Sequence, residues 1–280
     1  MNIITETLLW TGTIVLLIGY IGKWQKHHLR VLGYLLLGLF WVAQSPHFFS
    51  MGDVVNAGLC LIALPLFSYF AYQEVLSHRW AEDPGLMRFL AASVSVSMLI
   101  YYGIQRVPVA AGMLTRIVAD HTNFILNLMG YEFILGSIDY AANPLFYRIN
   151  HEQIGVSIRG SGIRIIFACT AIQTLAPAGA LITFTTAEVK RKVKSLLLVL
   201  PTIYVANLFR NVMVVYLTYE GITSFHTAHN TIAKAGSMIV LIILMLTVFE
   251  IMPEFYDNII GIISLPKREK LSAGNNRKDL

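Results

Sequence analysis

Seven apolar segments, most of them long enough to cross a membrane, dominate this chain of 280 residues. An α-helix needs about 20 consecutive apolar residues to cross a hydrocarbon core about 30 Å thick. Only 13% of the residues are charged and 56% are hydrophobic, whereas a soluble domain carries about 25% charged residues. We therefore predict an all-α polytopic membrane protein that forms a single integral membrane domain over residues 1–280. The predicted spans are Ile3–Gly22, Val31–Phe49, Asp53–Tyr72, Leu90–Ile104 with its flanks, Ile163–Ala187, Ser195–Tyr219 and Thr231–Met252.

The distribution of basic residues predicts the orientation of these spans. Four clusters hold 14 of the 21 Lys and Arg residues, and all four fall on one side if Val107–Gly130 does not cross the membrane. Because cytoplasmic loops are enriched in Lys and Arg, we predict an extracytoplasmic N-terminus and a cytoplasmic C-terminus. The net charge of +5 reflects this distribution, so we expect no nucleic-acid partner. The four clusters are Lys23–Arg30, Arg79–Arg88, Lys190–Lys194 and Lys267–Lys278.

Val107–Gly130 is too polar for a simple lipid-facing helix, because it contains Arg116, Asp120 and His121. We predict an amphipathic or partly embedded segment on the outer side, with an eighth crossing as the alternative. Residues 107–162 then form an extracytoplasmic segment and loop. The apolar–polar alternation of Val156–Ile165 predicts a short hairpin that leads into the next span. At the end of the chain, residues 266–280 are predicted to form a basic cytoplasmic tail.

The predicted span Ile163–Ala187 contains Cys169, and we predict that reactive side chains converge on this thiol. Arg210 lies in the following span, and His226 and His229 lie at the mouth of the last one. In the predicted topology all of them reach the outer leaflet at a similar depth. The thiol, the guanidinium and the imidazole that a nucleophilic reaction would need therefore come from three consecutive helical segments.

Such a group of residues supports nucleophilic catalysis by cysteine. A thiol attacks as the thiolate, and a neighbouring cation lowers the pKa of the thiol. Arg210 could stabilise the thiolate or a developing oxyanion, and His229 could act as acid and base. We favour His229 as the base because it lies one turn deeper in the last span, and His226 is the second choice. Residues 163–252 are therefore the predicted catalytic helices.

Other interpretations stay open at this point. A lone membrane cysteine such as Cys169 is usually a small hydrophobic residue, and an arginine such as Arg210 can extend its charge to the interface or pair helices. A non-enzymatic small-solute transporter, with Arg210 in its pathway, is the main alternative class. The two histidines could be half of a metal site. Because the chain has no HExxH motif and few carboxylates nearby, we predict no metal and no cofactor.

Three motifs in the second half of the chain carry a family resemblance. They are ACTAIQ at 168–173, ANLFRN at 206–211 and HTAHN at 226–230. Together they resemble the exosortase/archaeosortase superfamily, and the Thr-Ala-Ile-Gln that follows the Cys is most similar to the archaeosortase branch. The resemblance implies that Cys169 is the nucleophile and Arg210 the catalytic cation, with His229 in the third position. We assign Thr170, Gln173 and Asn207, which are polar residues of the first two motifs, to substrate binding.

The resemblance also implies an activity, partners and a location. Members of this superfamily are membrane transpeptidases, and those of the archaeosortase branch act on exported proteins such as the surface-layer glycoprotein. The sorting tail of these substrates carries Pro-Gly-Phe, a transmembrane helix and a basic cluster, and the cleaved protein is joined to a membrane lipid. We therefore expect a multi-pass cell-membrane enzyme whose active site faces the extracytoplasmic side. Intramembrane hydrolysis without lipid transfer would use the same site and differ only in the acceptor.

Overall fold

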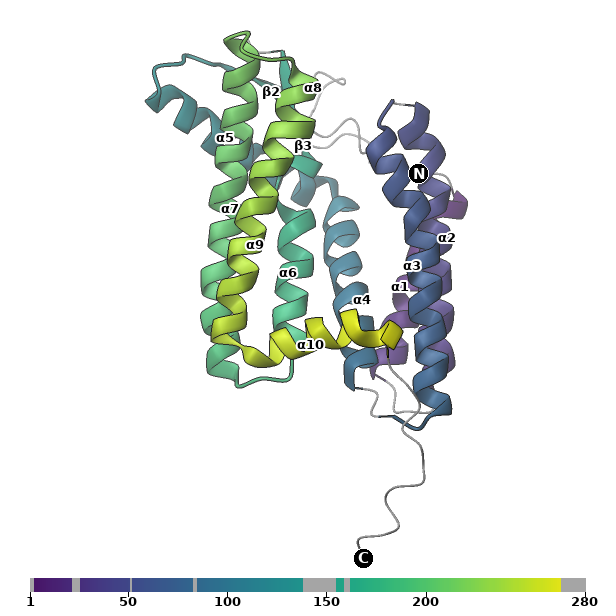
Figure 1. Cartoon of the computed structure of the whole chain (residues 1–280). Helices are drawn as coiled ribbons and strands as arrows, with labels where there is room; N and C mark the ends of the chain where they lie inside the picture. The colour runs from purple at the N-terminus through teal and green to yellow at the C-terminus, as the bar shows by residue number, and fades with distance from the viewer. Residues whose placement is uncertain are drawn as a thin grey trace, which may run out of the picture. The chain divides into compact units, whose positions relative to one another are not determined.

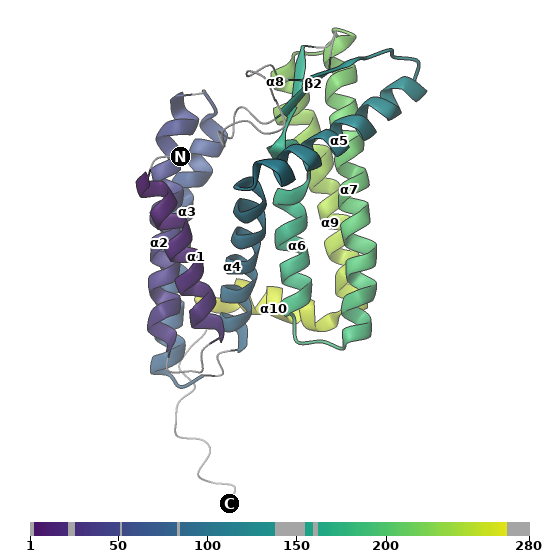
Figure 2. The same ribbon diagram turned by 180° about the vertical axis from the view of Figure 1, so that it is seen from behind.

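The computed structural model describes residues 3–21, 26–50, 52–82, 85–137, 155–158 and 162–267. Figures 1 and 2 show the course of the chain from opposite sides. The chain divides into two compact units, one made of Met1–Val96 with Tyr256–Leu280 and the other of Ser97–Phe255.

The first unit is built from long apolar helices. α2 packs against both α1 and α3. Gly33 of α2 permits a close approach to α1, because a Cβ atom added there would lie 2.7 Å from the Cβ atom of Leu16. Small residues at such crossings let helix backbones come together in membrane proteins. The helices of this unit are α1 (Ile3–Ile21), α2 (His27–Ser50), α3 (Val54–Arg79) and the first part of α4 (Gly85–Gln105).

A buried ion pair joins α2 to α3. The guanidinium of Arg30 contacts the carboxylate of Glu74 and donates a second hydrogen bond to the carbonyl of Gly19, and both charged side chains are only 1% exposed. The predicted span Val31–Phe49 therefore begins too late, since α2 already starts at His27 and includes the end of the basic cluster Lys23–Arg30. The helix can include Arg30 because a carboxylate and a carbonyl inside the bundle offset the loss of hydration.

The second unit is built around its long helix α7, which packs against α5, α6 and α9. Both ribbon views show α7 and α9 side by side. A core of buried residues from α5, the small sheet and α7 includes Val118, Leu126, Ile158, Ile165 and Val212. The elements are α5 (Pro108–Leu128), β1 (Leu135–Ser137), β2 (Gly155–Ile158), β3 (Ile163–Ile166), the 3₁₀ turn η2 (Phe167–Cys169), α6 (Ile172–Phe184), α7 (Val189–Tyr219), α8 (Phe225–Thr227), the π-helical turn η3 (Ala228–Ile232) and α9 (Ala233–Ile251).

Within the described residues, six helices are long and apolar enough to cross a membrane, namely α1, α2, α3, α4, α7 and the continuous segment Phe225–Ile251. This confirms the predicted all-α polytopic membrane protein. The predicted span Ile163–Ala187 differs, because it is helical only over the 13 residues of α6. At a rise of 1.5 Å per residue, α6 is about 20 Å long. Cys169 consequently lies before α6 and outside all six helices.

The start of the predicted fifth span is a strand because it pairs with the strand before it. β2 and β3 are antiparallel, with Gly155 opposite Ile166 and Ile158 opposite Ile163. The predicted hairpin over Val156–Ile165 is confirmed by this pairing. β1 adds a third strand on the other edge of β2, which no pattern in the sequence predicted.

The polar segment Val107–Gly130 contains the helix α5, which is not among the six membrane-length candidates. One face of α5 is buried through residues that include Ala111, Thr115, Val118 and Thr122. The opposite face carries an ion pair between Arg116 and Asp120, whose side chains are 45% and 47% exposed. This pattern matches the predicted amphipathic helix. Its location on the outer side stays a prediction.

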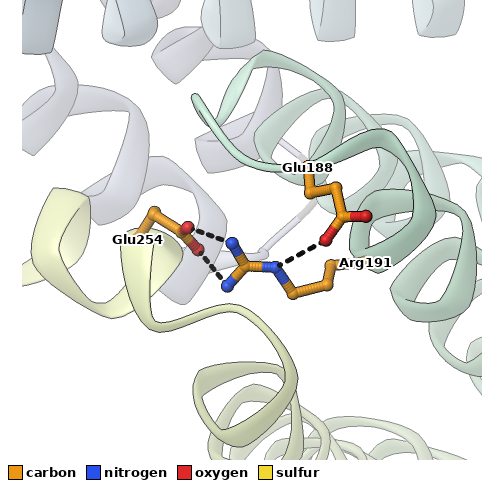
Figure 3. Close-up of polar contacts among 3 residues, drawn as sticks. All are labelled: Glu188, Arg191 and Glu254. Carbon is orange, nitrogen blue, oxygen red and sulfur yellow. Dashed lines mark hydrogen bonds and ion pairs between the residues drawn. The ribbon is translucent and has the colours of Figure 1, made fainter.

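A short amphipathic helix after α9, α10 (Pro253–Ser264), was not predicted. Arg191 of α7 forms two parallel hydrogen bonds with the carboxylate of Glu254 at the start of α10, and its Nε atom lies 3.8 Å from Glu188 (Figure 3). One residue of the predicted basic cluster Lys190–Lys194 thus connects α7 to α10. Nearly all of the predicted tail lies outside the described residues, which end at Lys267.

Candidate functional site

Cys169 lies in a tight connection between strand β3 and helix α6, at the end of the 3₁₀ turn η2. The 3₁₀ turn η2 closes with Thr170, whose backbone N–H and hydroxyl both donate to the carbonyl of Phe167, at 3.0 and 2.7 Å. Ala171 then adopts the left-handed conformation with φ +67°, and α6 begins at the next residue. The sequence predicted Thr170 as a substrate-binding residue, but it is only 2% exposed and bonded within the turn.

Helix α7 supplies the polar side chains that face this turn. Asn207 Nδ2 donates to the carbonyl oxygen of Cys169 at 2.7 Å, and Asn211 Nδ2 donates to the same atom at 3.2 Å. Arg210 Nη1 donates in turn to Asn211 Oδ1 at 3.4 Å. The N-x-x-R motif therefore holds the backbone of the cysteine as well as supplying the cation.

Arg210 also contacts His229, which lies 19 residues further along the chain. Arg210 Nη2 is 3.4 Å from His229 Nδ1. A guanidinium has only donors, so Nδ1 is the acceptor and the neutral imidazole carries its proton on Nε2. His229 can therefore accept a proton at Nδ1 only when Arg210 turns away from it, for example toward a substrate oxyanion.

A π-helical turn places His229 next to Arg210. The turn covers Ala228–Ile232, and such turns are frequent at functional sites. The ring of Phe225 stacks on the imidazole of His229 with centroids 5.3 Å apart and fixes its plane. His226 is exposed in the preceding short helix α8. The geometry therefore brings His229, and not His226, to Arg210.

The electrostatics of Cys169 combine burial with a nearby cation. Burial raises the pKa of the Cys169 thiol, while a backbone hydrogen bond from Ile166 and the charge and side-chain hydrogen bond of Arg210 lower it. Burial is the largest of these effects, so the pKa is raised overall. Removing the charge of Arg210 would raise it further and leave less thiolate at neutral pH.

Two residues near the site were missed from the sequence. Asn211 could have been found, because it directly follows Arg210 and lies four residues after Asn207 on one helix face. Tyr101 of α4 packs against Phe167, with ring centroids 5.4 Å apart, and so lies next to the turn that contains Cys169. No sequence pattern pointed to Tyr101. Gln173, a predicted substrate-binding residue, is exposed in the first turn of α6.

Among the described residues, no group of three or more His, Cys, Asp or Glu side chains could hold a metal ion. The guanidinium of Arg210 acts on the Cys169 thiol and also contacts the imidazole of His229. Such a set can form and resolve a covalent acyl intermediate.

Comparisons with known proteins agree with the motifs. The family model described as Transmembrane exosortase (Exosortase_EpsH) matches residues 6–249. Archaeosortase A of Haloferax volcanii is 24% identical over 229 residues, which cover 76% of this chain and 71% of that protein. Archaeosortase A of Natronomonas pharaonis is also 24% identical, over 218 residues covering 75% of this chain and 66% of that protein. No solved structure gives a significant match.

Proposed function

The chain belongs to the transmembrane exosortase family, and from this premise we propose that it is a membrane cysteine transpeptidase. The observation that supports the proposal is the convergence of three reactive groups from separate segments. Arg210 of α7 reaches His229 of η3 by a hydrogen bond and acts on the thiol of Cys169. The thiol has a cation and an imidazole within the same network, which is what nucleophilic catalysis by cysteine needs.

The first half-reaction forms a thioester. The Cys169 thiolate attacks the carbonyl carbon of a peptide bond, so that a C–S bond forms and the carbonyl oxygen becomes an oxyanion. Arg210 stabilises this charge in a site of low dielectric constant. His229 takes the thiol proton and gives it to the departing amine as the C–N bond breaks. The C-terminal fragment leaves and the substrate stays on Cys169 as an acyl group.

The second half-reaction transfers the acyl group to an acceptor. A hydroxyl or amine of a membrane lipid attacks the thioester, a C–O or C–N bond forms, and the C–S bond breaks. His229 removes the proton of the acceptor and returns it to the sulfur. Water as acceptor would give hydrolysis through the same steps. The half-buried Cys169 lies just before the apolar helix α6, and this position favours acceptors that arrive from the bilayer.

The curated relatives are both archaeosortases A, and this supports a proposal for the substrates. We propose exported proteins of the surface-layer glycoprotein type, whose C-terminal tail carries Pro-Gly-Phe, a transmembrane helix and basic residues. Gln173 is exposed in the first turn of α6, four residues after Cys169, and is the favoured contact for such a tail. Asn207 and Thr170 already hydrogen-bond to the backbone of the turn.

Trapping the acyl-enzyme tests the proposal directly. The full-length protein in detergent or vesicles is mixed with a tail-bearing substrate, quenched in acid and analysed by intact-protein mass spectrometry. The expected product is an adduct on Cys169 with the mass of the fragment N-terminal to the cleavage site, removable by hydroxylamine. A transporter would form no such adduct. Processing without any adduct in the quenched protein would contradict the thioester mechanism.

His229→Ala should slow thioester formation by about 10²- to 10⁴-fold, because a positioned acid–base group contributes that much. His226→Ala is the matched control and should retain most of the rate, since His226 is exposed and lies outside the Arg210 contact. The rate of adduct formation is measured for both variants in a rapid-quench experiment. A larger loss of rate in the His226 variant would show that His226, and not His229, is the base.

The proposed location of the site outside the cytoplasm predicts a labelling pattern. In a background of Cys60→Ala and Cys169→Ala, Glu132→Cys should react with a membrane-impermeant maleimide in intact cells, and Lys190→Cys should react only after permeabilisation. Glu132 precedes β1 and Lys190 lies at the start of α7, and both are exposed. Labelling of the Lys190 variant in intact cells would reverse the orientation.

A further inference from the structure

Two asparagine side chains of α7 donate to one backbone carbonyl beside the proposed nucleophile. The amide nitrogens of Asn207 and Asn211 lie 2.7 and 3.2 Å from the carbonyl oxygen of Cys169. A carbonyl oxygen has two lone pairs and can accept both bonds. Residues four apart on a helix lie on the same face, so α7 presents the two amides side by side to this single atom.

The carbonyl that they hold lies just before a strained backbone position. Ala171 has φ +67° and is 4% exposed, and the left-handed conformation is unfavourable for a residue with a Cβ atom. Such a conformation persists only where the surrounding structure holds it. Two hydrogen bonds to the Cys169 carbonyl restrain the turn at that point and therefore the direction of the Cys169 side chain.

Asn211 has a second contact that Asn207 lacks in the described hydrogen bonds. Its Oδ1 atom accepts from Arg210 Nη1 at 3.4 Å, while its Nδ2 atom donates to Cys169. The side chain is only 5% exposed, so little water competes for either bond. The Asn211 amide thus connects the backbone of Cys169 to the guanidinium of Arg210. The second terminal nitrogen of that guanidinium, Nη2, contacts His229.

We propose that Asn207 and Asn211 are positioning residues: both fix the turn that presents the Cys169 thiol, and Asn211 also sets the direction of the Arg210 guanidinium. Neither touches the substrate. The inference rests on the nucleophilic role of Cys169 proposed above. In this proposal the N-x-x-R-N sequence of α7 holds the Cys169 thiol and the Arg210 guanidinium in fixed positions relative to each other.

The chemistry of an amide makes the proposal specific. Asn211→Asp is nearly the same size but has no N–H to donate, and its carboxylate would attract Arg210 away from the thiol. Arg210 of α7 is the cation whose charge and hydrogen bond favour the Cys169 thiolate. Tyr101 of α4 packs against Phe167 of the same turn, and His229 contacts Arg210. Drawing Arg210 away would therefore disfavour the thiolate. Asn207→Asp would lose the bond to the Cys169 carbonyl and bring a negative charge near the turn, without the contact to Arg210 that position 211 has.

The test measures the thiol without any substrate. In full-length protein carrying Cys60→Ala, the rate of Cys169 alkylation by iodoacetamide is followed against pH, and thermal melting reports folding. Asn211→Asp should move the midpoint of the alkylation profile upward by about one pH unit, and Asn211→Ala should move it upward by less. Asn123→Ala, which removes a half-buried amide from α5, is the matched control and should leave the midpoint unchanged.

Turnover of a tail-bearing substrate gives the second measurement. kcat should fall by about 10²-fold in Asn211→Asp, the size expected for a misplaced reacting group, and by less in Asn207→Asp, with KM little changed in both. An unchanged midpoint and kcat in a folded Asn211→Asp protein would overturn the proposal, as would a change in KM alone. Alkylation needs no substrate, so the pH profile can be interpreted even if the transpeptidase assignment is wrong. The trapping experiment tests that assignment separately.

Discussion

Cys169→Ala and Cys169→Ser should reduce tail processing below detection, a loss of at least about 10³-fold, while the protein still accumulates in the membrane. The physical reason is that only the sulfur of Cys169 can form the thioester, and an alanine or hydroxyl in its place leaves Arg210 and His229 without a nucleophile to activate. Processing is followed by the mobility shift of a tail-bearing substrate in cells, and accumulation by immunoblot.

Cys60→Ala is the internal control for this experiment. Cys60 is 3% exposed within α3 of the other unit, and it lies in none of the three motifs that carry the family resemblance. Processing by this variant should be close to that of the unmodified protein. Tail removal by the Cys169→Ala protein at a normal rate would end the catalytic interpretation of Cys169.

Arg210→Lys should lower turnover by about 10²- to 10³-fold, as expected for loss of an oxyanion donor, although the positive charge is kept. The guanidinium of Arg210 uses two different nitrogens, one toward Asn211 and one toward His229. A lysine ammonium is a single point with a different reach and cannot reproduce that planar arrangement. Turnover is measured with purified protein and a tail-bearing substrate, and folding is checked by thermal melting.

Arg116→Lys on α5 is the matched control, because Arg116 forms an exposed ion pair with Asp120 that a lysine can replace at little cost. Its turnover should be unchanged. Near-normal turnover of a folded Arg210→Lys protein would reduce Arg210 to a structural charge and leave the stabilisation of the oxyanion to other groups.

The sequence predicted most of the helices, because apolar runs of membrane length leave few alternatives to α-helix in a bilayer. It failed where a short apolar run is compatible with both a strand and a helix. The segment Ile163–Cys169 is rich in β-branched residues, and pairing with β2 decides in favour of β3 and a 3₁₀ turn. α10 was missed although its sequence is amphipathic, because a helix of 12 residues is too short to register as a span.

The candidate site divides in the same way. The motifs of the sequence were sufficient to single out Cys169, Arg210 and His229, since a thiol, a guanidinium and an imidazole are chemically recognisable wherever they occur. His229 was preferred to His226 because it lies one turn deeper in the last span and because the family resemblance puts it in the third position. The structure places it 3.4 Å from Arg210, and its role as the base stays a prediction.

Sequence by itself determined that this chain is a multi-span membrane protein with a thiol, a cation and an imidazole in its second half, because hydropathy and side-chain chemistry are local properties. Only the tertiary structure decided how these groups are held. The hydrogen bonds from Asn207 and Asn211 to the Cys169 carbonyl join positions 38 and 42 residues apart. Contacts of that kind depend on how α7 packs against the turn, and no local pattern specifies a backbone carbonyl as the partner of a distant amide.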